Sequence, residues 1–295
     1  MPPYDGEQFT DRLRLERVDR DIFTGWCHAG APLRAFGGQV AAQALVAAGS
    51  TIDEPGRHVH SLHGYFLRPG RTTDAIVYLV DRLRDGRSFT TRRVRAVQYG
   101  EVIFAMSASF AVDEPGVEHQ ATMPDLPGPE KYQPVQTPHA AADPELGAEG
   151  FPYHQLLDVR LVDDATAARL SGDRAHRMAW LRTHRPLPDD ALTHVCTLTY
   201  FSDLTLAGTT LVPHPGTDDD DLDIASIDHA MWFHSPFRAD EWLLFATDSP
   251  VARGGHGLAR GEFFTRDGVL VASAVQEVLL RDRTARRGAS PGQPG

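Results

Sequence analysis

Alternating hydrophobic and polar residues between positions 36 and 112 predict one apolar helix followed by a meander of strands. The helix is expected to begin at Gly37 and Gly38 and to continue through the apolar run at 40–48. Alternation and turn signals predict four strands, at 58–67, 76–83, 88–98 and 101–112. An apolar helix with antiparallel strands is typical of an α+β domain whose sheet curls around the helix.

The second half of the chain repeats this order. Strands are expected at 156–162, 176–182, 224–233, 242–247, 257–265 and 269–280, with a helix at 192–206. Three pairs of landmarks lie 165 to 168 residues apart: Phe36 and Phe201, Pro69 and Pro236, and Gly100 and Gly268. The first of these offsets aligns Asp203 with Gly38 and places both at a helix start. A repeat of this length predicts two copies of one domain rather than a solenoid of short units.

A proline-rich segment separates the two copies. Prolines stand at 115, 124, 127, 129, 134, 138 and 144, and no hydrophobic period survives between them. We therefore expect an N-terminal domain over residues 1–113 and a linker over 114–150. A C-terminal domain over 151–282, carrying the catalytic residues, and a flexible tail over 283–295 complete the expected organisation.

Composition and charge narrow the class of protein. The 295 residues are 41% hydrophobic and 23% charged, which is ordinary for a globular protein with two cores. A net charge of −11 argues against a nucleic-acid partner, and no segment approaches the roughly 18 to 20 apolar residues of a membrane span. The N-terminus lacks the apolar core of a signal peptide, and Cys27 and Cys196 are too few for a disulfide framework. We expect a cytoplasmic protein without membrane insertion.

Seven motifs occur in a specific order along the chain. They are FGGQ at 36–39, HSLHGYFLRPG at 60–70, LRDGRSF at 83–89, YFSDL at 200–204, SIDHAMWFH at 226–234, RGEF at 260–263 and VQE at 275–277. Together they resemble the acyl-CoA thioesterase II family, from roughly Phe23 to Arg281, with the linker least similar. The resemblance implies an α+β double hotdog fold, in which two tandem curved antiparallel sheets each wrap around a central helix.

The resemblance also implies an activity and the residues that perform it. Members of the family hydrolyse fatty acyl-CoA to free acid and CoA without a metal or other cofactor. The positions that hold the attacking water in the family match Asp203, Ser226 and Gln276. This trio is chemically reasonable because a thioester carbonyl is electrophilic enough for an oriented water with a general base.

Each of these three residues also has a purely structural interpretation. Asp203 at a helix start would cap the free N–H groups there. Ser226 could be a small strand residue, and Gln276 could lie on a solvated strand face, although a buried amide would need partners. On the offsets of the repeat, Gly38 and Ala108 occupy the positions of Asp203 and Gln276. The first half therefore lacks both polar groups.

Four further residues are candidates for binding the substrate. Backbone N–H groups at Gly37 and Gly38 could hold the oxyanion of the reaction, since glycine lets a ligand approach the backbone. His63 is a candidate for a position near the substrate. Arg93 shares a strand face with Arg95, where both could contact CoA phosphates or equally pair with local acids.

Other patterns in the sequence resemble functional motifs but lack residues that those motifs require. Histidines at 58, 60 and 63 have no neighbouring Cys or carboxylate, so we expect no metal site. Asp228-His229 resembles part of a charge relay, but no G-x-S-x-G motif supplies a nucleophile. The aspartates at 218–221 are expected in a solvated loop, and the glycine pair at 37–38 lacks the third glycine of a dinucleotide motif.

Two other functions remain open from the sequence. One is a hotdog hydratase or dehydratase that acts on acyl thioesters, and the other is a non-catalytic acyl-CoA-binding or scaffold protein. Curved sheets in this family usually associate further, so we expect a homo-oligomer. The acyl chain length cannot be inferred, because it depends on residues scattered over both halves.

Overall fold

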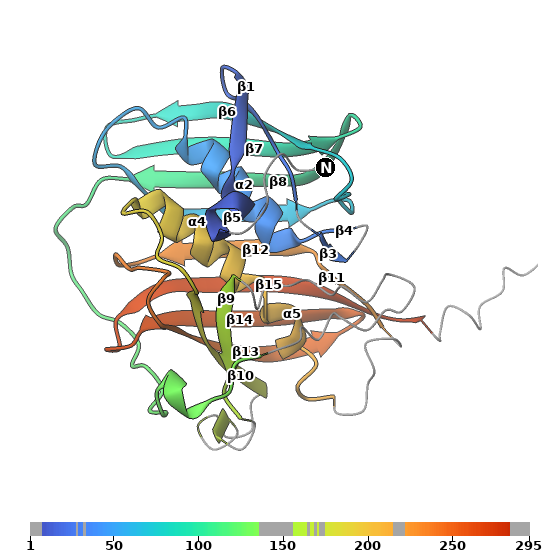
Figure 1. The fold of residues 1–295 in the computed structure, drawn as a ribbon, viewed down its shortest axis with the longest axis vertical. Helices are drawn as coiled ribbons and strands as arrows, with labels where there is room; N and C mark the ends of the chain where they lie inside the picture. Colours follow the sequence, from blue (N-terminus) through green and yellow to red (C-terminus); the bar gives the residue numbers. More distant parts are fainter. Residues whose placement is uncertain are drawn as a thin grey trace, which may run out of the picture.

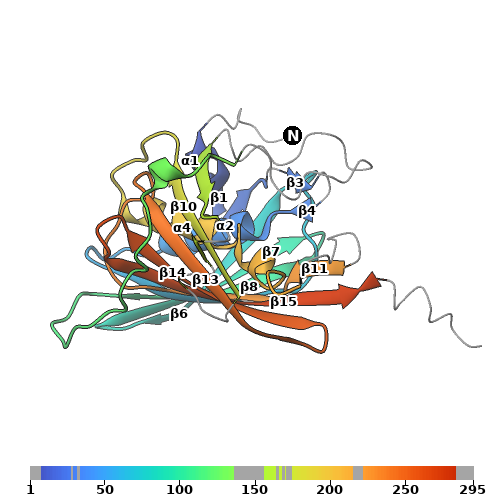
Figure 2. The same ribbon diagram turned by 90° about the horizontal axis from the view of Figure 1, so that it is seen from below.

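One continuous antiparallel sheet organises the molecule. The structure is a computed structural model that describes residues 8–27, 29–31, 34–135, 156–163, 166–167, 170, 175–214 and 222–283. Within this part of the chain, 13 strands form a single curved sheet, and the helices lie on one side of it (Figures 1 and 2). The aspartates at 218–221, most of the tail and residues 136–150 of the linker lie outside the described residues.

The first half contains the expected helix and meander. Its elements are α2 (Gly37–Gly49), β5 (His58–Phe66), β6 (Ile76–Asp85), β7 (Phe89–Gln98) and β8 (Glu101–Ala111). Most of α2 is buried, because its small alanine side chains let the sheet approach the helix closely. Alternate strand residues such as Val94 and Ala96 face the helix.

The hydrophobic pattern did not predict the elements before residue 36. These are α1 (Phe9–Leu13), β1 (Leu15–Asp19), β2 (Ile22–Gly25), β3 (Ala29–Ala31) and β4 (Arg34–Ala35). All are short, and β1 is largely exposed, so it lacks a buried face that would produce alternation. The Phe9 ring of α1 lies edge-on to Tyr200 and Phe201 at 5.0 and 5.9 Å, so the N-terminal segment packs on the second half.

The second half contains the same helix and meander, with three differences from expectation. Its elements are η1 (Pro129–Lys131), β9 (Leu157–Leu161), β10 (Ala175–Thr183), α4 (Ala191–Ser202), α5 (Leu206–Thr209), β11 (Leu222–Ser226), β12 (Asp228–Phe233), β13 (Leu243–Arg253), β14 (His256–Thr265) and β15 (Leu270–Asp282). The strand expected at 224–233 is interrupted at Ile227, and the helix expected to reach 206 ends at Ser202. The strand expected at 242–247 continues to Arg253.

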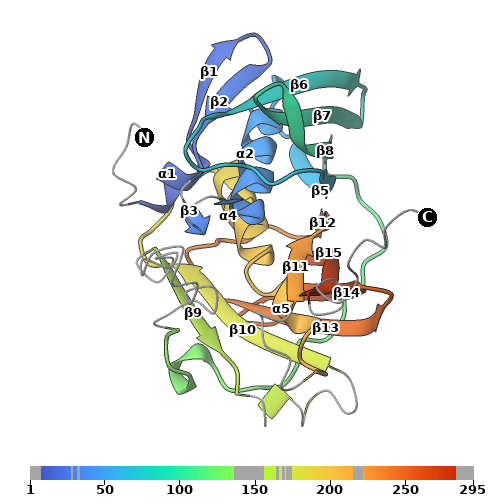
Figure 3. The ribbon, with the colours of Figure 1, turned by 90° about the vertical axis from the view of Figure 1, so that its right-hand side faces the viewer.

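Strands β5 and β12 join the two halves edge to edge. They pair antiparallel, with Leu62 opposite Met231 and Gly64 opposite His229. The two central helices, α2 and α4, also contact each other. They run antiparallel inside the curve of the sheet (Figure 3). The start of α2 therefore lies beside the end of α4, and this junction positions the candidate site.

Strand register relates the two halves residue by residue. In the ladder β5–β8, Leu62 pairs with Ala108. An offset of 167 or 168 residues carries these positions to His229 and Gln276. These two residues are adjacent to the paired residues Ala230 and Val275 of β12 and β15, and their side chains approach to 3.3 Å. The sheet register therefore gives Ala108 as the counterpart of Gln276, as the repeat in the sequence predicted.

The helices follow a different offset, and the expected counterpart of Asp203 was wrong. Asp203 is the C-cap of α4, and the C-cap of α2 is Ser50, so these two residues are equivalent. Gly38 lies at the opposite end of its helix. The offset changes because the connection from helix to strand is longer in the second half: β5 begins eight residues after Ser50, whereas β11 begins 19 after Asp203.

The described part of the linker crosses the second half in close contact with it. Tyr132 belongs to a small core cluster with Trp180, Leu244 and Phe264. Gln120 donates a hydrogen bond to the backbone carbonyl of Gly268 at 2.8 Å. These contacts anchor the segment to β14 and β15 instead of leaving it a free tether.

Candidate active site

Asp203 lies at the carboxyl end of α4, not at a helix start as expected. Its backbone is helical, at φ −86° and ψ −3°, and the N-cap of α4 is Asp190, whose carboxylate accepts from the Thr193 N–H. The capping interpretation of Asp203 therefore fails. A carboxylate gains nothing from the negative end of its own helix dipole, so this placement needs another explanation.

A β-bulge brings Ser226 to the same side of the sheet as Asp203. The register between β11–β12 and β15 shifts by one residue, because Ser226 pairs with Val278 whereas Ala230 pairs with Val275. Simple alternation would place Ser226 and His229 on opposite faces, since they are three residues apart. The extra residue at Ile227 turns both toward the helices.

The three expected catalytic residues converge on one carboxylate oxygen. Gln276 Nε2 donates to Asp203 Oδ1 at 2.6 Å, and Ser226 Oγ donates to the same oxygen at 3.2 Å. Gln276 is fully buried on β15, whereas Asp203 and Ser226 are half-buried. Among the described residues, no hydrogen bond reaches Asp203 Oδ2. One carboxylate oxygen is thus fixed, and the other is available for chemistry.

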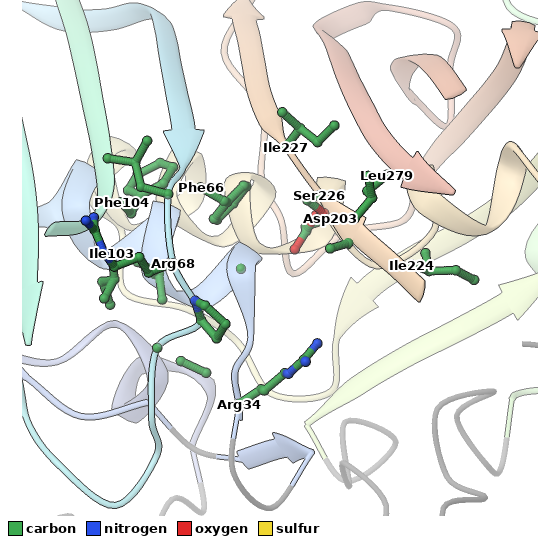
Figure 4. Close-up of a pocket in the computed structure, with 17 residues that line it drawn as sticks. Arg34, Phe66, Arg68, Ile103, Phe104, Asp203, Ile224, Ser226, Ile227 and Leu279 are labelled. Atoms are coloured by element: carbon green, nitrogen blue, oxygen red, sulfur yellow. Dashed lines mark hydrogen bonds between the residues drawn. The ribbon is translucent and has the colours of Figure 1, made fainter. Parts of the chain in front are cut away.

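Asp203 and Ser226 form one wall of a cleft of about 390 Å³ between the two halves. Phe66 and Phe104 line the other side, and the exposed residues Arg34 and Arg68 also contribute (Figure 4). Further lining residues are Gly37, Val40, Ile103, Ile224, Ile227 and Leu279. An apolar cleft with a few convergent polar groups is typical of a small-molecule site.

Gly37 places the amino end of α2 against the carboxylate. A Cβ added at this position would lie 2.8 Å from Asp203 Oδ2 and 3.0 Å from the Phe66 ring. The N-cap residue, Phe36, makes no side-chain hydrogen bond to the first turn, so no N-cap side chain covers the N–H groups of Gly37 and Gly38. The Asp203 carboxylate thus lies beside the positive end of the α2 dipole.

We expect Gly37→Ala to lower kcat by about 10- to 100-fold, because the new methyl group must displace Asp203 or Phe66 and small misplacements of reacting groups are costly. Steady-state kinetics would measure the effect. Gly116→Ala is the matched control, since nothing lies within 4 Å of a Cβ there. Equal activity of the two variants would contradict the close approach of Gly37.

His229 is a site residue that the sequence did not assign. Its Nδ1 lies 3.3 Å from Gln276 Nε2, and its Nε2 lies 2.7 Å from Ser202 Oγ. Burial lowers the pKa of His229, partly offset by the charges of Asp203 and Asp228. The side chain is thereby kept as a neutral imidazole. The motif at 226–234 contains this histidine, but its sequence pattern suggests only a charge relay to a serine nucleophile.

The remaining expected substrate-binding residues do not line this cleft. A Cβ on Gly38 would lie 2.7 Å from the Tyr200 carbonyl oxygen, so this glycine permits the close packing of α2 on α4. His63 is exposed and lies edge-on to Trp232 at 5.1 Å. Arg93 is exposed on β7, on the sheet face opposite to buried Arg92 and Val94. The helices cover the inner face, so Arg93 and His63 point away from the site.

Neither a cluster of metal ligands nor a membrane-spanning helix occurs among the described residues. There, no three metal-ligating side chains cluster as a bound ion would require. In the same part of the chain, no helix has the length and apolar character to cross a bilayer.

Comparison with known proteins extends over nearly the whole chain. The family model for acyl-CoA thioesterase matches residues 154–279, and that for the acyl-CoA thioesterase N-terminal domain matches 23–111. Acyl-CoA thioesterase 2 of Haemophilus influenzae is 40% identical over 91% of this chain and 95% of its own. Acyl-coenzyme A thioesterase 8 of Mus musculus is 38% identical over 92% and 88%.

A solved structure supports the same relationship. The acyl-CoA thioesterase II TesB2 of Mycobacterium marinum superposes with a TM-score of 0.81 at 44% identity, covering 93% of this chain and 98% of that one. The fold expected from the sequence, an α+β double hotdog, is confirmed by this likeness. The chain belongs to the acyl-CoA thioesterase II family of thioester hydrolases.

Proposed function

We propose that the protein hydrolyses the thioester of a fatty acyl-CoA with a water molecule activated by Asp203 and held by Ser226 and Gln276. The observation that carries this proposal is the carboxylate whose Oδ1 accepts from both side chains while Oδ2 faces the amino end of α2. Gln276 Oε1 is buried and has no partner within the described chain, so it can accept a hydrogen bond from the water.

Asp203, Ser226, Gln276 and the amino end of α2 are sufficient for each step of the proposed hydrolysis. Asp203 takes a proton from the water as its oxygen attacks the thioester carbonyl carbon. The N–H groups of Gly37 and Gly38, at the amino end of α2, stabilise the negative oxygen that forms. The C–S bond then breaks, CoA leaves as the thiolate, and the proton held by Asp203 neutralises it. Ser226 and Gln276 orient the carboxylate and the water through both steps.

The first half contributes shape rather than acid–base groups. Ser226, His229 and Gln276 correspond by strand register to Val59, Leu62 and Ala108, which are all apolar. We therefore assign one hydrolytic site to each chain, and the apolar residues of the first half, such as Phe66 and Phe104, to the channel for the acyl group.

Measuring free thiol released from a panel of saturated acyl-CoA chain lengths tests the proposal directly. Thiol release with stoichiometric free acid supports hydrolysis. Water addition to an enoyl-CoA without thiol release would instead support the hydratase alternative. Binding of acyl-CoA without turnover would support a non-catalytic role. The location in the cytoplasm and the homo-oligomer stay predictions, and gel filtration with light scattering would measure the latter.

Arg34 is the residue of the cleft that we assign to the CoA phosphates, in place of Arg93. It is exposed, and the described residues give it no ion pair, whereas Arg68 is bound to Glu101 at 2.9 Å. A guanidinium suits phosphate because it donates two parallel hydrogen bonds. We expect Arg34→Ala to raise KM for acyl-CoA several-fold with little change in kcat.

The corresponding acyl-pantetheine, which lacks the nucleotide phosphates, provides the control for this prediction. Its KM should be the same for the wild type and Arg34→Ala. An equal rise in KM for both substrates would show that Arg34 acts on the cleft itself and not on the phosphates.

A further inference from the structure

A buried polar pair in the second half replaces an apolar pair of the first. Leu62 and Ala108 face α2 from neighbouring strands, and the equivalent positions hold His229 and Gln276. His229 is 1% exposed and Gln276 is 0% exposed. Since the same fold is built with leucine and alanine in the first half, the sheet itself does not require the polar pair. A buried polar pair costs free energy unless it is fully bonded, so its presence calls for a chemical role.

The hydrogen bonds of His229 have only one consistent direction. Gln276 Nε2 is a donor, so Nδ1 of His229 must accept from it, and the imidazole proton must lie on Nε2. That N–H then donates to Ser202 Oγ at 2.7 Å. The Ser202 hydroxyl donates in turn to the Thr199 carbonyl oxygen at 2.8 Å. The chain of donors thus ends on the backbone of the last turn of α4.

This direction excludes a serine nucleophile at Ser202. In a serine–histidine pair the imidazole must accept the hydroxyl proton, with its other nitrogen donating to an acid. Here the other nitrogen faces an amide N–H, and Ser202 is fully buried. The pair is built to hold an orientation, not to transfer a proton from serine.

The pair of His229 and Ser202 fixes the orientation of the Gln276 amide. A glutamine side chain can rotate its amide by half a turn and exchange oxygen for nitrogen. After such a rotation, Oε1 would stand against Asp203 Oδ1, where a donor is needed at 2.6 Å. The unprotonated Nδ1 of His229 accepts from the same amide nitrogen and so favours only the productive orientation. Asp203 and Asp228 are the charged groups near this imidazole, and its burial keeps it neutral.

We propose that His229 and Ser202 are positioning residues that lock the amide of Gln276, with its N–H toward Asp203 and its oxygen toward the hydrolytic water. This inference rests on the proposed hydrolytic function of Asp203. His229 contacts neither water nor substrate in this arrangement. Its contribution is to raise the fraction of molecules in which Gln276 is correctly oriented, which affects kcat more than KM.

The test is a comparison of His229→Leu with His229→Asn. Leucine copies the first-half residue Leu62 and removes the acceptor, so we expect kcat to fall roughly 10- to 100-fold with KM within about threefold. Asparagine places an oxygen near the position of Nδ1, and we expect it to restore kcat to within about tenfold of wild type. Ser202→Ala should give a smaller loss, because the imidazole keeps its contact with Gln276.

His194→Leu is the matched control. His194 is a buried histidine on α4 whose Nδ1 accepts from the Ala239 N–H, without any contact to Gln276. We expect this variant to lose thermal stability and keep kcat. If His229→Leu fails to fold, the kcat values of His229→Asn and Ser202→Ala still test the positioning role.

Three results would overturn the proposal, and the first two concern His229. One is a normal kcat in His229→Leu, and the other is an equal loss in His229→Asn and His229→Leu. A loss in Ser202→Ala as complete as that in Asp203→Asn would also overturn it by pointing to a serine nucleophile. If Asp203→Asn itself stayed active, the hydrolytic function would fail. Loss in Asp203→Asn with normal turnover in His229→Leu would refute the positioning role alone.

Discussion

Asp203→Asn is expected to lower kcat/KM by on the order of 10³-fold, because an amide cannot take the proton of the attacking water. The substitution preserves size and still offers one oxygen to Ser226 and Gln276, so the contacts that hold the side chain are largely retained. Thiol release from acyl-CoA under saturating and limiting substrate would measure the change. Circular dichroism and Tm should stay close to wild type, since Asp203 does not cap α4 at its amino end.

A matched control lies at the other end of the same helix. Asp190 is the true N-cap of α4, and asparagine caps as well as aspartate does. Asp190→Asn should therefore keep both stability and full activity. Near-normal turnover by Asp203→Asn would contradict the proposed mechanism. A loss shared by both variants would point to a general effect of removing negative charge from α4.

Gln276→Ala is expected to reduce kcat by about 10²-fold while KM changes only a few-fold. The alanine reproduces Ala108 at the equivalent ladder position, so β15 should tolerate it without rearranging. Asp203 Oδ1 would then lose its 2.6 Å donor, and the water would lose the buried amide oxygen that we propose as its acceptor. Both losses act on the transition state more than on substrate binding.

Pre-steady-state kinetics would separate the chemical step from product release in this variant. A slower chemical step with unchanged acyl-CoA affinity is the expected outcome. A rise in KM at constant kcat would assign Gln276 to uniform substrate binding and remove its role in holding water. Tm measurements are needed alongside, because the alanine leaves a cavity beside His229.

Much of the fold followed from local patterns. Most strands of both meanders were predicted to within a few residues, since each has one buried face and therefore alternates, but β13 continues six residues beyond its expected end and the strand expected at 224–233 is divided into β11 and β12. The elements before residue 36 were not predicted. The side chains of β1 are mostly exposed, and α1 is too short for a period, so it depends on tertiary contacts such as those of Phe9 with Tyr200 and Phe201.

The candidate site was only partly predictable. Alternation correctly put Arg93 and Arg95 on one strand face, but a period of two cannot say which face meets the helices. Similarly, no pattern revealed the extra residue at Ile227 that turns Ser226 and His229 to the same side. A bulge depends on pairing with β15, which is distant in the sequence.

The sequence by itself determined that the chain carries two copies of an α+β unit, and it indicated Asp203, Ser226 and Gln276 in the second copy as the candidate catalytic residues. Local periodicity and motif identity contain that information. Only the tertiary structure decided that Asp203 ends a helix, that it faces the start of α2 from the other half, and that His229 contacts Gln276. These relations depend on how two helices and strands far apart in the chain pack together, and packing of distant segments leaves no local pattern.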